Sequence, residues 1–156
     1  MTDIGNKEWV DWLNTKVLQK AVVVDDVGNI LSLCRISTGP APRLDKWDLP
    51  GGCVSPQDLN NTENPIFAAI FREVLEETGL QVFKSEAIYV SSWVFERSPG
   101  KILGVAIGYK CQVRGVKPEV KLSLEHYQFQ WGSKEAILAL DFGDDGGLHS
   151  GIISKC

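Results

Sequence analysis

The sequence predicts a single mixed α/β domain, in which strands lie on both sides of one central helix in chain order. Three observations lead to this prediction. The 156 residues suit one domain that buries a core of its own, over 1–156. Runs rich in Val, Ile, Tyr and Phe are separated by turn-forming segments. One well-marked helix interrupts these runs, so the pattern differs from a regular parallel β-α repeat.

The first part of the chain is typical of strands and turns. Residues 8–18 start with an amphipathic pattern that is typical of either a short helix or an edge strand. Residues 20–36 hold two apolar runs joined at DDVGN, where Gly28 and Asn29 favour a hairpin turn. Residues 37–46 are expected to form a loop before the glycine pair at 51–52.

The segment 64–79 carries start and stop signals of an α-helix. Asn64 can cap the first turn, and Pro65 at the first helical position loses no hydrogen bond. Gly79 can take the left-handed conformation that ends helices. The pattern predicts an apolar face of Phe67, Ile70, Phe71, Val74 and Leu75, and an opposite face of Ala69, Glu73, Glu76 and Glu77.

The last third predicts more strands, then a helix. Residues 81–96 and 102–113 are typical of two long strands joined as a hairpin. A short strand is expected within 122–131 and a helix over 133–140. Residues 143–156 are expected to be a mobile tail, because the aspartates near their start lack the spacing of a calcium-binding loop.

Composition excludes several classes of protein. The net charge is −4 without a basic block, which argues against binding a nucleic-acid polymer. No apolar run approaches the roughly 18 residues that span a bilayer. The polar, acidic start is unlike a signal peptide, and the four cysteines form no paired zinc-binding motif. We therefore expect a cytoplasmic protein.

Three glutamates suggest chemistry on the central helix. Glu73, Glu76 and Glu77 are spaced i, i+3 and i+4, so the spacing predicts that they share one face despite their mutual repulsion. Carboxylates are the ligands that magnesium prefers. Taken alone, the three residues are more typical of a solvated acidic face. The preceding WDLPGG (47–52) favours a site, because two glycines after a strand allow a tight turn near the helix.

Together these segments resemble the Nudix hydrolases, whose box is G-x5-E-x7-R-E-U-x-E-E-x-G-U, with U a bulky aliphatic residue. REVLEETGL (72–80) fills the second half without a mismatch, and WDLPGG is similar to the usual lead-in. The resemblance implies a Nudix-type α/β/α sandwich with a mixed β-sheet.

The first half of the box departs from the pattern. Ten residues separate Gly52 from Glu63, and counting back from Arg72 puts Asn64 where the family has its early glutamate. We expect an insertion of five or six residues in this loop. Whether Asn64 simply caps the helix or Glu63 swings into the site stays open.

The resemblance also implies roles for the second half. Glu73, Glu76 and Glu77 would bind Mg²⁺ or Mn²⁺, the carbonyl of Gly51 would complete the metal shell, and Glu73 is a candidate base for water. Arg72 would hold the glutamates by ion pairing, the alternative being a plain surface pair with Glu76.

Three further residues are candidates. LEHYQFQW (124–131) is similar to a later family segment, in which Glu125 would be an extra metal ligand or general base. His126 is expected to be structural. Arg35 is a candidate for binding phosphate and Trp47 for stacking on a base, against the alternatives of a surface charge and a core aromatic.

The resemblance implies a metal-dependent hydrolysis of a phosphoanhydride bond in a nucleoside diphosphate linked to another moiety. A nucleoside triphosphate, normal or modified, is the broadest expected substrate. The alternative is a catalytically weak or inactive Nudix domain that binds a nucleotide as a sensor. A protein unrelated to the family would require the whole box to be accidental. The expected partner is a small nucleotide, and a homodimer is left open.

Overall fold

The computed structural model of the chain describes residues 14–36, 45–97 and 100–156. The prediction for 8–18 lies partly outside these ranges, and its described part, 14–18, belongs to a strand. The predicted hairpin in 20–36 and the long strands after the central helix are confirmed.

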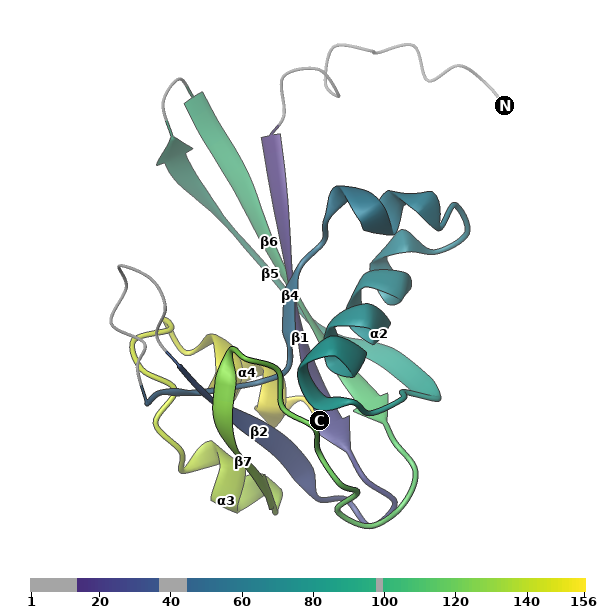
Figure 1. Cartoon of the computed structure of the whole chain (residues 1–156). Helices are drawn as coiled ribbons and strands as arrows, with labels where there is room; N and C mark the ends of the chain where they lie inside the picture. The colour runs from purple at the N-terminus through teal and green to yellow at the C-terminus, as the bar shows by residue number, and fades with distance from the viewer. Residues whose placement is uncertain (1–13, 37–44, 98–99) are drawn as a thin grey trace.

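Within the described residues, one mixed sheet of seven strands forms the centre of the molecule (Figure 1). The order β3-β2-β1-β6-β5 is extended by β4, which pairs with β1, and by β7, which pairs with β2. Only β1 and β6 run parallel, and the other pairs are antiparallel. The strands are β1 (Asn14–Val24), β2 (Ile30–Arg35), β3 (Trp47–Asp48), β4 (Gly51–Cys53), β5 (Lys84–Arg97), β6 (Gly100–Gln112) and β7 (His126–Gly132).

Helices cover both faces of the sheet, which confirms the α/β/α sandwich. The helices are the 3-10 turn η1 (Pro56–Asn60) and the α-helices α2 (Pro65–Thr78), α3 (Lys134–Leu138) and α4 (Leu148–Ser154). Side chains of β1 alternate between the two faces of the sheet. Ala21 and Val23 belong to a hydrophobic cluster with Ile70 and Val74 of α2, the α2 cluster. Val22 and Val24 belong to a second cluster with Ile152 and Ile153 of α4, the α4 cluster. The two hydrophobic clusters therefore share the central strand.

The ends of α2 follow the predicted signals. The Asn64 side chain accepts a hydrogen bond from the Phe67 amide at 3.3 Å, and Pro65 is the first helical residue. Gly79 has φ 71°, and its amide donates to the Leu75 carbonyl at 2.8 Å. Both ends of the helix are thereby fixed.

The predicted separation of α2 into an apolar and a polar face is wrong. Ala69 and Glu77 are buried, while Phe71 and Leu75 are 39% and 48% exposed. The reason is that α2 packs against both the sheet and the glycine turn at β4. The turn draws the Glu77 side chain inward with a hydrogen bond, so a carboxylate occupies the buried stripe.

The prediction of a mobile tail over 143–156 is also wrong. This segment leads into α4, where His149, Ile152 and Ile153 are buried. The adjacent isoleucines pack in the cluster that contains Val22 and Val24. Burial of these side chains anchors the C-terminal helix on the sheet. No helix in the described ranges has the length and apolar character needed to span a membrane.

Candidate active site

Two glycines bring strand β4 against helix α2. The Gly51 amide donates a hydrogen bond to Glu77 Oε2 at 2.9 Å, and Gly51 has φ 146°. A Cβ atom on Gly51 would lie 2.1 Å from the Gln19 carbonyl oxygen. A Cβ atom on Gly52 would lie 2.8 Å from the Glu73 carboxylate. Glycine is therefore required at position 51, whereas a side chain at position 52 would displace the Glu73 carboxylate.

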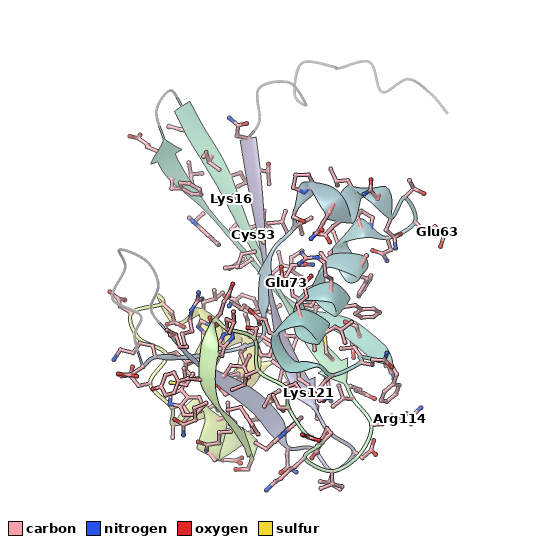
Figure 2. The ribbon with its side chains drawn as sticks, viewed as in Figure 1. Lys16, Cys53, Glu63, Glu73, Arg114 and Lys121 are labelled. Carbon is pink, nitrogen blue, oxygen red and sulfur yellow. The ribbon has the colours of Figure 1, made fainter. Side chains whose placement is uncertain are left out.

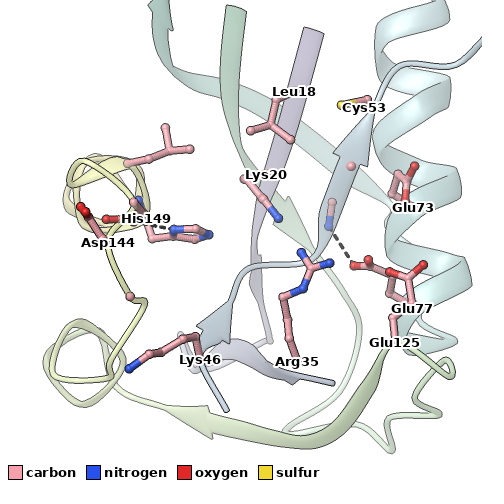
Figure 3. Close-up of a pocket in the computed structure, with 15 residues that line it drawn as sticks. Leu18, Lys20, Arg35, Lys46, Cys53, Glu73, Glu77, Glu125, Asp144 and His149 are labelled. Atoms are coloured by element: carbon pink, nitrogen blue, oxygen red, sulfur yellow. Dashed lines mark hydrogen bonds and ion pairs between the residues drawn. The ribbon is translucent and has the colours of Figure 1, made fainter. Parts of the chain in front are cut away.

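A cavity of about 730 Å³ opens beside this turn (Figure 3). Glu73 and Glu77 reach it from α2, and Glu125 reaches it from the segment before β7. Lys20 and Arg35 point into it from the sheet, opposite Glu77. A further side is lined by Gly143, Asp144, Asp145, Leu148 and His149. An acidic wall and a basic wall thus face one another across one cavity.

Burial perturbs the two α2 glutamates. It raises the pKa of Glu77 to about 8, although the Gly51 amide and the Lys20 charge favour the carboxylate. Burial also raises the pKa of Glu73, against the ion pair with Arg72. Burial thus makes the charged form of each carboxyl group less favourable than it is in water, and most strongly for Glu77.

Glu76 points elsewhere. Its side chain is 56% exposed, it bonds to Arg72 Nη1 at 3.0 Å, and it does not line the cavity. The described residues contain no cluster of three acidic, His or Cys side chains close enough to hold a metal ion. The structure thus brings two of the three predicted glutamates, Glu73 and Glu77, to the same cavity. A metal-binding role for Glu76 stays a prediction.

Arg72 is more than one half of a surface pair. Its Nη2 atom lies 2.9 Å from Glu73 Oε1, in addition to the bond from Nη1 to Glu76. Its Nε and Nη2 atoms donate to both carboxylate oxygens of Asp58, at 2.8 and 3.0 Å. The guanidinium therefore ties three carboxylates together in the geometry that favours bidentate pairing.

A buried carboxylate organises the basic wall. Asp48 accepts from Lys20 Nζ at 2.7 Å and from Arg35 Nη1 at 3.0 Å. The charge of Lys20 and the hydrogen bond to His149 hold the pKa of Asp48 well below its usual range despite burial. Lys20 was missed in the sequence, although a lysine directly before the apolar run AVVV is a signal of a buried charge with a partner.

The remaining predicted residues lie in different surroundings. Glu125 is exposed and lines the cavity, whereas His126 is buried outside it beside Ser123. Burial lowers the pKa of His126. Trp47 does not line the cavity and packs against the hydrophobic cluster under α4, so its position favours the alternative of a core aromatic.

Comparisons with known proteins agree with this geometry. The sequence matches no family model and no curated protein. A MutT protein from Methanosarcina mazei matches in structure with a TM-score of 0.61 and 29% identity, over 84% of this chain and 86% of that one. A Nudix hydrolase from Nitrosomonas europaea matches with a TM-score of 0.57 and 25% identity, over 90% of each chain.

The chain has the fold and the box of the Nudix hydrolases. A third similar structure shares the fold at 15% identity and a TM-score of 0.63, over 96% of this chain and 90% of that one. It is the Nudix domain of NrtR from Shewanella oneidensis, bound to ADP-ribose.

The structure resolves the altered first half of the Nudix box. Asp58 follows Gly52 after five residues, which is the spacing of the early acid in the pattern. Its side chain is 4% exposed and holds Arg72 in the bidentate pair described above. The hydrogen bond from Arg72 lowers the pKa of Asp58 to about 2, against the effect of burial. Sequence reasoning missed Asp58 because it counted back from Arg72 across the insertion.

The insertion in this Nudix box therefore follows the early acid, and the expectation that it precedes that acid is wrong. Thirteen residues separate Asp58 from Arg72, where the pattern has seven. The added residues complete η1 and the turn into α2. Glu63 lies at the outer end of this turn, well apart from Glu73 (Figure 2), and Asn64 caps the helix.

Proposed function

We propose that the chain hydrolyses a phosphoanhydride bond in a nucleoside diphosphate linked to another moiety. A nucleoside triphosphate, normal or modified, is the broadest candidate substrate. The observation that carries the proposal is the acidic wall of Glu73 and Glu77 facing the basic wall of Lys20 and Arg35. A polyphosphate needs both, because cations bind its oxygens and carboxylates bind the metal that neutralises it.

The residues fit a magnesium or manganese ion. Two carboxylates whose pKa values are raised by burial converge on one cavity, and Gly52 leaves open the space beside Glu73. Magnesium usually binds one or two carboxylates together with substrate phosphates rather than a closed protein cage. In the proposal Glu73 and Glu77 hold the ion, with Glu76 and the Gly51 carbonyl as further ligands. When bound, the ion lowers the pKa of water and stabilises the leaving phosphate.

The chain's own residues supply orientation and a base. Arg72 positions Glu73 through the contact at 2.9 Å. Lys20 and Arg35 receive phosphate oxygens. Glu73 and Glu125 are the candidate bases for the attacking water, because both reach the cavity. Trp47 has no substrate contact in this proposal.

A phosphate-release screen over nucleotides with magnesium tests the function. Glu77→Gln and Glu76→Gln keep the side-chain shape and remove a charge, so each is expected to lower kcat/KM at least about 10²-fold. Glu135→Gln, an exposed glutamate at the start of α3, is the matched control and should keep wild-type activity. Equal activity in all variants, or no activity of the wild type on any nucleotide, would defeat the proposal.

A nucleotide-binding sensor is the second candidate function. Two observations favour it: the rearranged first half of the box, and the similar fold of the NrtR Nudix domain, whose structure holds ADP-ribose. A sensor would bind ADP-ribose in calorimetry and leave it intact after long incubation with magnesium. Cleavage of a nucleotide by the wild type, lost in Glu77→Gln, would exclude it.

The proposal includes a cytoplasmic setting and a small-molecule partner. Cys34, Cys53, Cys111 and Cys156 are all free thiols, which is compatible with a reducing compartment. A homodimer is also part of the proposal.

A further inference from the structure

A second polar cluster connects the C-terminal helix to the cavity. His149 Nε2 lies 2.6 Å from Asp48 Oδ1, and His149 Nδ1 lies 2.6 Å from Asp145 Oδ2. Asp48 in turn holds Lys20 and Arg35. A continuous chain of charged and hydrogen-bonding groups therefore runs from Asp145, before α4, to the basic wall of the cavity.

The cluster is buried and well fixed. The side chains of His149 and Asp48 are each 1% exposed. The Phe142 ring stacks on the imidazole, with ring centroids 4.9 Å apart and planes 6° apart. The Asp145 carboxylate also accepts from the Gly147 and His149 amides at the start of α4. Burying such groups is costly unless each is paired, and here each of them has at least one partner.

Asp48 divides its acceptor capacity among three side chains. Oδ1 accepts from Lys20 and His149, while Oδ2 accepts from Arg35. The Lys20 ammonium has three N–H donors, of which one goes to Asp48 and one to the Leu49 carbonyl at 3.3 Å. Within the described ranges, Arg35 bonds to Asp48 through Nη1 alone. Both residues therefore have N–H groups that these contacts do not use, and both line the cavity.

We propose that His149 is a positioning residue for substrate phosphate. Because His149 forms one of the hydrogen bonds that the buried Asp48 carboxylate needs, Lys20 and Arg35 can direct their remaining N–H donors at phosphate oxygens. Without the imidazole, Asp48 would be compensated by these two cations only, and both would turn further onto it and away from the cavity. This inference rests on the proposed function, since it assumes that phosphate is the ligand of the basic wall.

The binding experiment uses methylenediphosphonate, a diphosphate analogue that cannot be hydrolysed, measured by calorimetry with magnesium. His149→Phe keeps an aromatic ring to stack on Phe142 and removes both hydrogen bonds. It is expected to weaken diphosphonate binding about tenfold, the scale of one lost charge-assisted hydrogen bond. His149→Gln, which can still donate to Asp48, should recover part of this loss. Manganese affinity, followed by electron paramagnetic resonance, should stay at the wild-type value.

The matched control is Ile152→Val on the same helix. Ile152 is fully buried in the α4 cluster, so the change loosens the packing of α4 without touching Asp48. A purely structural role of His149 predicts that both variants lose binding equally, and that result would overturn the proposal. Wild-type binding by His149→Phe would overturn it as well. The proposal expects the loss for His149→Phe alone, and in turnover an increased KM with kcat maintained.

A crystal structure of His149→Phe separates this inference from the proposed function. We expect the Lys20 ammonium and the Arg35 guanidinium to move toward Asp48. Unchanged positions of both groups would contradict the inference. If the wild type binds no diphosphonate, the proposed function fails, and the crystal structure still decides whether His149 positions the two cations.

Discussion

Asp58 and Arg72 illustrate how much the site depends on single ion pairs. Arg72 contacts three carboxylates, of which Asp58 is the most buried, with a side chain 4% exposed. Asp58 is also the carboxylate that binds Arg72 through both oxygens. Asp58 also accepts from the Ser55 amide at 2.8 Å and from its hydroxyl at 3.0 Å. It therefore joins the turn η1 to the helix that carries Glu73. We expect a change at Asp58 to affect folding stability and activity together.

The effect of Asp58 on stability should depend on pH. Its pKa is about 2 in the folded protein against the ordinary 3.8, so the ion pair stabilises the fold above pH 3.8 and this stabilisation is lost as pH falls toward 2. The full contribution is about 2 kcal/mol. We expect the difference in unfolding free energy between wild type and Asp58→Asn, measured in urea, to shrink by about 1 kcal/mol between pH 6 and pH 3. A difference that stays constant over this range would show that the charge of Asp58 is unimportant.

At the scale of elements, the two glycines of β4 have different roles: Gly51 is needed for folding and Gly52 for the position of Glu73. Gly51→Ala would place a Cβ atom against backbone atoms, and residues with a side chain rarely adopt the φ of 146° found here. The variant should therefore destabilise the protein by more than about 1 kcal/mol. Gly52→Ala places Cβ against the movable end of Glu73. It should therefore lower activity about tenfold or more with little change in stability.

Thermal unfolding and kcat/KM of the two variants check this contrast. The pair is matched, because the same methyl group is added at neighbouring positions. A Gly52→Ala variant that unfolds as easily as Gly51→Ala would mean that the Glu73 side chain cannot move aside. A fully active Gly52→Ala would argue against Glu73 as a metal ligand or base.

The elements that could be predicted from sequence are those with local signals. Asn64, Pro65 and Gly79 bound α2 through contacts within a few residues, and the turn at 25–29 joins its own strands. Residues that act across the chain were missed. Lys20, Asp48 and His149 meet only because β1, β3 and α4 pack together, and no spacing along the sequence contains that information. The exposure of Phe71 and Leu75 is likewise decided by packing, since both fit the periodicity of an apolar face.

At the scale of the whole molecule, the sheet has one long free edge. β5 ends the strand order, and within the described ranges it pairs with β6 alone. Figure 1 shows β5, β6 and the start of β1 projecting beyond the helices. Val90, Trp93 and Val94 of β5 are 69%, 43% and 62% exposed. Long apolar edge strands are usually covered, because their unpaired backbone groups favour pairing with another strand.

A second copy of the chain is the partner that we expect on this edge. Sedimentation of the wild type should show a monomer–dimer equilibrium, because two β5 edges can pair and cover Val90 and Val94 on both copies. Val94→Lys puts a charge in the pairing edge and should shift the protein to monomer. Val116→Lys is the matched control: Val116 is 60% exposed but lies in the turn after β6, so this variant should dimerise like the wild type. A wild type that stays monomeric at all concentrations, or two lysine variants that behave alike, would exclude the β5 edge as the dimer surface.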